Sequence, residues 1–166
     1  EEIRSYDAPK PMEQQEAPLT ADADAPRMPA TPPPANRGAE ITLDAPDGWR
    51  TLDTGGGMRL AAYEVGEAPD VATTTVIALG GEAGGALANV NRWRGQIDLP
   101  PIDEGQLAEV SADLTVAGSP ATAVELIGDE RSILAVILPR GSRTYFIKMT
   151  GPTELVRQEK GGFRSL

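Results

Sequence analysis

The sequence predicts an α+β fold: a largely antiparallel sheet of about six to seven strands, with a central helix and a C-terminal helix packed on its faces. Two observations lead to this class. Short runs rich in β-branched residues recur from residue 39 onward, and most of them are joined by short turns. Helical spacing of apolar residues is confined to the middle of the chain and to its end. A proline-rich segment, residues 1–38, precedes this predicted domain, which covers residues 39–166.

The first half of the predicted sheet comes from three runs. Residues 40–44 alternate between apolar and polar side chains and stop at a turn signal, residues 45–48. Residues 58–65 and 71–79 also read as strands, because β-branched and aromatic side chains suit a pleated, half-buried surface. Each strand of this half therefore ends in a segment typical of a turn or loop.

The central helix follows a glycine-rich connection at residues 80–85. Its apolar positions Ala86, Val90, Trp93 and Ile97 are spaced by four, three and four residues, which places them on one face of an α-helix. We expect the pair of prolines at residues 100 and 101 to end it. The glycines lack the lysine of a phosphate-binding loop, so a flexible connection is the plain interpretation and an anion at the helix N-terminus the alternative.

The second half combines a short helix, four strands and a final helix. Asp103 and Gln106 have the spacing of a capping box, which predicts a helix over residues 103–110. Four predicted strands follow, at residues 113–117, 122–127, 133–138 and 144–149, and a hairpin turn at residues 140–143 joins the last two. A helix over residues 152–163 closes the chain, with Pro152 in its first turn.

The N-terminal segment differs in composition from the rest. Residues 1–38 hold eight prolines, and their large apolar side chains are isolated from one another. Such a segment forms neither an amphipathic helix nor a continuous strand, so we expect an extended tether that lies along a partner, with packing on its own domain as the alternative. The expected contact residues are Ile3, Tyr6, Met12, Leu19 and Met28.

Composition excludes several classes of function. The chain has no His and no Cys, which excludes imidazole or thiolate metal sites, disulfides and a Ser-His-Asp triad. Its net charge of −10 argues against nucleic-acid binding. With few aromatic residues to build a sugar-binding cleft, a hydrolase that uses carboxylates is a weak alternative. We therefore expect no enzyme activity, no cofactor and no directly bound metal.

Three short segments carry a family resemblance: residues 45–49, residues 80–100 and residues 144–152. Together they resemble bacterial extracytoplasmic proteins of unknown function whose layout is similar to the PsbP-like fold, an α/β/α sandwich. The resemblance covers residues 39–166. It implies a binding or accessory role on a photosynthetic or respiratory membrane complex, and it supplies no catalytic residue.

Two groups of basic residues are the candidate contacts of the domain. The central helix carries Asn89, Arg92 and Arg94 beside Trp93, a composition typical of interface hot spots; the alternative is Trp93 in the core and both arginines in solvent. Arg140 and Arg143, with Lys148 nearby, form a basic cluster at the predicted hairpin. This cluster either orients docking or only keeps the turn soluble.

The sequence therefore predicts a non-catalytic extracytoplasmic accessory subunit that docks on and stabilises a larger membrane protein complex through its N-terminal segment and an arginine-bearing surface. We expect a periplasmic, membrane-associated location. The printed chain begins at Glu1, which leaves room for a signal peptide or a lipidated Cys upstream. A periplasmic lipoprotein that binds a small or apolar ligand is the alternative. The identity of the partner complex lies beyond the sequence.

Overall fold

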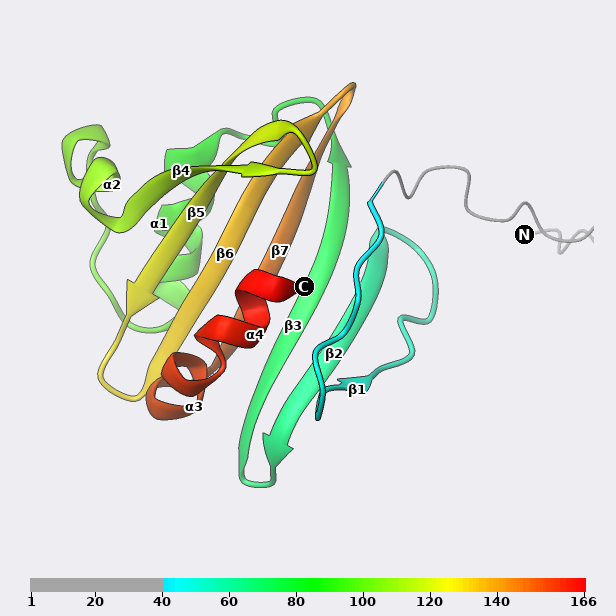
Figure 1. The fold of residues 1–166 in the computed structure, drawn as a ribbon. Helices are drawn as coiled ribbons and strands as arrows, with labels where there is room; N and C mark the ends of the chain where they lie inside the picture. Colours follow the sequence, from blue (N-terminus) through cyan, green and yellow to red (C-terminus); the bar gives the residue numbers. More distant parts are fainter. Residues whose placement is uncertain (1–40) are drawn as a thin grey trace, which may run out of the picture. The chain divides into compact units, whose positions relative to one another are not determined.

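The computed structural model describes residues 41–166. The expected contact residues Ile3, Tyr6, Met12, Leu19 and Met28, and the tether as a whole, lie outside this described part. Within it, the predicted α+β class is confirmed: seven strands form one antiparallel sheet, and helices cover both of its faces (Figure 1). None of the helices in residues 41–166 is long and apolar enough to cross a bilayer.

The strands and helices occupy the following ranges. The strands are β1 (Arg50–Thr51), β2 (Arg59–Glu67), β3 (Asp70–Gly80), β4 (Ser111–Val116), β5 (Ser119–Ile127), β6 (Arg131–Arg140) and β7 (Arg143–Pro152). The helices are α1 (Ala86–Gln96), α2 (Glu104–Val110), α3 (Thr153–Gln158) and α4 (Lys160–Ser165).

The sheet consists of two antiparallel meanders joined in the middle. Its strand order is β1-β2-β3-β7-β6-β5-β4, so β1 to β3 form one meander and β4 to β7 the other. The two meet where β3 pairs with β7 in a register that runs from Thr73 opposite Thr150 to Gly80 opposite Arg143. Helices α1 and α2 lie in the connection from β3 to β4, and α3 and α4 follow β7. β4 and the short β1 are thus the two edges of the sheet.

Each face of the sheet has its own core because successive side chains of a strand point to opposite faces. On β6, Ile133, Ala135 and Ile137 pack with Val90 and Trp93 of α1. The Trp93 ring meets Phe146 of β7 edge to face at 6.0 Å. The expected helical face of α1 is confirmed, and Trp93 is a core residue.

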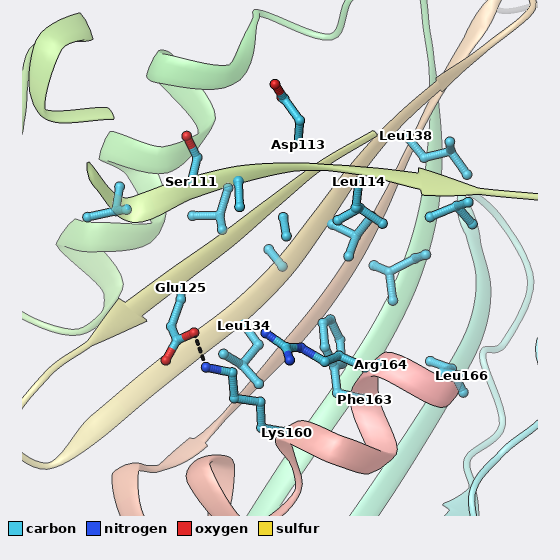
Figure 2. Close-up of a pocket in the computed structure, with 18 of the residues that line it drawn as sticks. Ser111, Asp113, Leu114, Glu125, Leu134, Leu138, Lys160, Phe163, Arg164 and Leu166 are labelled. Carbon is cyan, nitrogen blue, oxygen red and sulfur yellow. Dashed lines mark hydrogen bonds and ion pairs between the residues drawn. The ribbon is translucent and has the colours of Figure 1, made fainter. Parts of the chain in front are cut away.

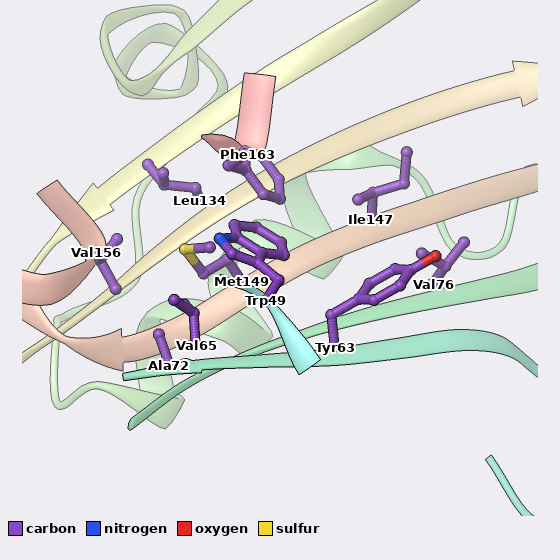
Figure 3. Close-up of a cluster of buried hydrophobic side chains, with 10 residues drawn as sticks. All are labelled: Trp49, Tyr63, Val65, Ala72, Val76, Leu134, Ile147, Met149, Val156 and Phe163. Atoms are coloured by element: carbon purple, nitrogen blue, oxygen red, sulfur yellow. The ribbon is translucent and has the colours of Figure 1, made fainter. Parts of the chain in front are cut away.

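The opposite face carries the second core, under α3 and α4 (Figure 3). Leu134 of β6 packs there with Val156 of α3 and Phe163 of α4. Trp49 joins them and donates from its indole nitrogen to Glu159 Oε2 at 2.8 Å. Figure 3 shows the indole between Phe163 and the strands, so this tryptophan connects the first strand region to the C-terminal helices.

Three local expectations are wrong. Residues 41–44 form no strand, although Ile41 and Leu43 keep the predicted alternation and pack against the core. The C-terminal helix is two short helices that meet at Glu159, where glycines 161 and 162 weaken a continuous helix. Helix α1 ends at Gln96, ahead of the prolines, because Asp98 adopts a positive φ of 58°.

Candidate functional site

A wide groove lies on the face of the sheet that carries α3 and α4. It has a volume of about 1010 Å³, and its floor is formed by β4, β5 and β6 (Figure 2). Helix α4 borders one side, and residues 41–43 also contribute to its lining. It has about twice the volume of a second hollow between β4 and β5, which measures about 510 Å³.

The floor is apolar because three strands turn their alternating apolar side chains to it. Leu134, Val136 and Leu138 of β6 line it, and so do Leu114 and Val116 of β4. The same alternation on the other half of the sheet is covered by Trp49 and α3. Helix α4 extends only from Lys160 to Ser165, too short to cover β4 and β5 as well. An apolar sheet face is therefore left open at this end.

The two sides of the groove carry opposite charges. On the α4 side, Lys160 pairs with Glu125 of β5, and Arg164 reaches over the groove (Figure 2). Arg164 is exposed and makes no hydrogen bond or ion pair within residues 41–166. On the β4 side, Glu109 is exposed at the groove, whereas the exposed Asp113 points to the opposite side of the strand (Figure 2). A ligand in the groove would thus meet the Arg164 cation on one side and the Glu109 carboxylate on the other.

The predicted polar residues of α1 contact their own chain. Asn89 is 3% exposed, and its amide nitrogen donates to the carbonyl oxygens of Ala83 at 2.9 Å and Gly85 at 2.7 Å. Its oxygen accepts a 2.6 Å bond from Arg92. The nitrogen Nε of Arg94 donates to the carbonyl of Pro100 at 2.6 Å. Asn89 and Arg94 thereby fix the loops before and after α1.

The pKa of Lys148 is lowered near this helix. Partial burial disfavours its charged form most, and the guanidinium of Arg92 adds repulsion. Its ammonium donates to Gln96 at 2.8 Å. Lys148 therefore belongs to the α1 face of the sheet, away from the hairpin cluster in which the sequence placed it.

Arg140 and Arg143 lie at the hairpin between β6 and β7, as expected, and face each other across it. Arg140 is half-buried and lines the groove, whereas Arg143 is exposed at the tip. The α1 arginines lie on the other face of the sheet. The structure therefore does not bring the two predicted arginine groups together, and a partner contact at either one stays a prediction.

Sequence reasoning missed the groove itself. Its lining comes from strands, from α4 and from residues 41–43, which are far apart in the sequence. The one available signal was the apolar alternation of residues 112–116, which has no facing helix long enough to cover it. Among residues 41–166, no group of three or more acidic side chains is placed to hold a metal ion.

Comparisons with known proteins find similarity among solved structures alone. No family model matches the chain, and no curated protein matches it. Among solved structures, the chain is similar to the solution structure of cyanobacterial PsbP (CyanoP) from Synechocystis, with 15% identity and a TM-score of 0.43 over 72% of this chain and 78% of that chain. That protein is a PsbP, and the three sequence segments resemble proteins with the PsbP-like fold. A likeness of this size says nothing about the function of this chain.

Proposed function

We propose that the chain is a non-catalytic, extracytoplasmic accessory subunit that docks on and stabilises a larger membrane protein complex. The single observation that carries the proposal is the open apolar groove over β4 to β6. The role of residues 1–38, the periplasmic location and the photosynthetic or respiratory setting rest on the sequence and its resemblance alone.

The groove supports docking because an apolar surface of this extent is expensive to leave in water. Soluble proteins seldom keep large contiguous apolar patches uncovered, and those that do mostly use them for binding. Ile127 at one end is 36% exposed, and Leu114 and Val116 are only half-buried. A partner that covers these side chains recovers their burial free energy.

A small apolar ligand is the second candidate, and the volume of the groove favours it. At about 1010 Å³ it matches the largest small-molecule sites. Against this candidate, the rim residues Ala112, Asp113 and Arg164 are exposed, so the groove is open along its length. A small-molecule site normally encloses most of its ligand, whereas an open groove suits a protein surface.

Native purification tests the proposal. The full chain is isolated from its source membrane in mild detergent, and mass spectrometry identifies the proteins that co-migrate with it. We expect stable co-migration with integral membrane subunits. Release as a free monomer with a bound small molecule would overturn the accessory role and leave the ligand-binding candidate.

A matched pair of variants links docking to the groove. Ile127→Glu places a charge at the groove, and Met58→Glu places one on a side chain that is 69% exposed outside it. We expect Ile127→Glu to reduce co-migration about tenfold, as buried interface charges do, and Met58→Glu to leave it unchanged. Equal co-migration of both variants would show that docking uses another surface.

A further inference from the structure

The edge strand β4 presents unpaired backbone groups beside the groove. Within residues 41–166 it pairs only with β5, through a two-residue turn in which residues 117 and 118 have positive φ. In such a hairpin the flanking pair, here Val116 and Ser119, exchanges both backbone hydrogen bonds, and bonded pairs then alternate along the ladder. Asp113 and Thr115 therefore turn their N–H and C=O groups to the free edge.

The position of Pro120 in β5 is consistent with this alternation of hydrogen-bonded and non-bonded pairs. It lies opposite Thr115, and these two residues form a pair that exchanges no backbone hydrogen bonds between β4 and β5. Because Pro120 has no N–H, that is the kind of position at which β5 can hold it without losing a bond to β4. The outward orientation of Thr115 thus follows from the turn and is consistent with its partner.

The side chains of β4 divide between the two faces of the sheet. Leu114 points toward the groove, and Asp113 points to the other side of the strand (Figure 2). A strand added at this edge would extend the groove face of the sheet and place alternate side chains beside Leu114 and Val116, on the face that carries Arg164. Its other side chains would lie beside Asp113, where a cation is favoured.

We propose that the free edge of β4 and the groove together bind an extended segment of a partner protein, as an added strand. The groove side of the segment is apolar and carries one acidic side chain for Arg164, and its outer side carries a basic residue beside Asp113. This inference rests on the proposed function and names the chemistry of its docking segment. Added strands gain affinity from backbone bonds and specificity from alternate side chains.

Opposite charges on the two sides of the groove favour a peptide over the other occupants. An anionic amphiphile in the groove would be attracted by Arg164 but repelled by Glu109. A second copy paired through β4 would place two Asp113 side chains on one face of the joined sheet, in molecules of net charge −10 each. A segment with both signs of charge satisfies both sides.

A defined peptide tests the inference on the full chain. The probe is the octapeptide Thr-Val-Lys-Val-Lys-Leu-Thr-Glu with fluorescein on its N-terminus, and its alternate residues match the two sides described above. Its control has the same sequence with alternate backbone nitrogens methylated, which blocks the ladder. We expect the probe to bind in fluorescence anisotropy, the control to bind about tenfold more weakly, and the amides of residues 111–116 to exchange more slowly in the complex.

Two variants locate the binding. Thr115→Pro removes an N–H that faces the edge, a substitution that edge strands tolerate, and Thr115→Val keeps that N–H. We expect Thr115→Pro to weaken the probe about tenfold and Thr115→Val to leave it within about twofold. Arg164→Glu should weaken it as well, whereas Arg143→Glu at the hairpin tip should have a smaller effect.

Three further outcomes would overturn the inference, and a fourth separates it from the proposed function. Equal binding of probe and methylated control would mean that the groove takes side chains without an added strand. Dimer formation lost on Thr115→Pro would identify a second copy as the occupant. Cross-links from position 115 to residues 1–40 of the same molecule would identify the chain itself. If the probe binds as expected but no membrane subunit co-migrates, the strand site stands and the accessory role fails.

Discussion

At the scale of single residues, the contact between Trp49 and Glu159 holds distant parts of the domain together. The two residues are 110 positions apart, and their side chains join the segment before β1 to the junction of α3 and α4. Trp49 is 8% exposed, so its indole N–H would lack a water partner if the carboxylate were removed. The sequence showed both residues but contained no signal that they meet.

We predict that Glu159→Ala lowers the free energy of unfolding by about 1 to 3 kcal/mol, because a buried donor loses a charged acceptor. Glu159→Gln keeps an acceptor at the same place and should cost clearly less. Urea denaturation followed by the fluorescence of Trp49 and Trp93 measures both. Equal losses for the two variants would mean that the negative charge of the carboxylate, rather than an acceptor oxygen at this place, matters.

At the scale of elements, the capping box of α2 is the expectation that the structure reproduces most closely. The Asp103 carboxylate accepts from the Gln106 N–H at 2.9 Å, and the Gln106 side chain accepts from the Asp103 N–H at 3.2 Å. This helix has no fully buried side chain, and only Leu107 and Val110, both partly buried, pack against the core. Local capping therefore determines where α2 begins.

We predict that Asp103→Ala destabilises α2 locally by about 1 kcal/mol, the usual loss for an N-cap. The effect should appear as faster hydrogen exchange at residues 104–110, with little change in the unfolding of the sheet. Glu104→Ala, in the first turn of the same helix, is the control and should have a smaller effect. A large fall in the melting temperature of the whole domain would contradict this assignment.

Other elements depended on contacts that sequence patterns do not carry. Residues 41–44 alternate as a strand does, yet they lie against the core without joining the sheet. The C-terminal helix breaks at Glu159, whose side chain is held by Trp49. For residues 41–44, packing against residues far along the chain outweighs the local pattern. At Glu159, the contact with Trp49 adds to the local weakness that glycines 161 and 162 introduce.

At the scale of the whole domain, the pairing of β3 with β7 joins the two meanders into one sheet. Within this joint Gly151 lies against Ala72: a Cβ added to Gly151 would lie 2.6 Å from the Cβ of Ala72 and 2.7 Å from its Cα. Both strands are central, so neither can move aside without disturbing its other neighbour. The joint therefore depends on a glycine at this position.

We predict that Gly151→Ala lowers the free energy of unfolding by about 2 kcal/mol or more, because an added methyl overpacks a rigid contact. Gly161→Ala is the matched control: an added Cβ there meets open space in α4, and the change should stabilise the protein by about 0.5 to 1 kcal/mol. Guanidinium denaturation of both variants checks the difference. A neutral Gly151→Ala would show that the two meanders can shift apart.

The sequence by itself determined the α+β class, six of the seven strands, the face of α1 and the capping box of α2, because periodicity and capping are local properties of the chain. Only the tertiary structure decided which sheet face stays open and which charges border it. Lys160, Arg164 and Leu134 meet at the groove because two meanders and a short helix bring them together, and that packing is invisible in local sequence. For the same reason Arg140 lies at the groove while Arg92 and Arg94 lie on the opposite face.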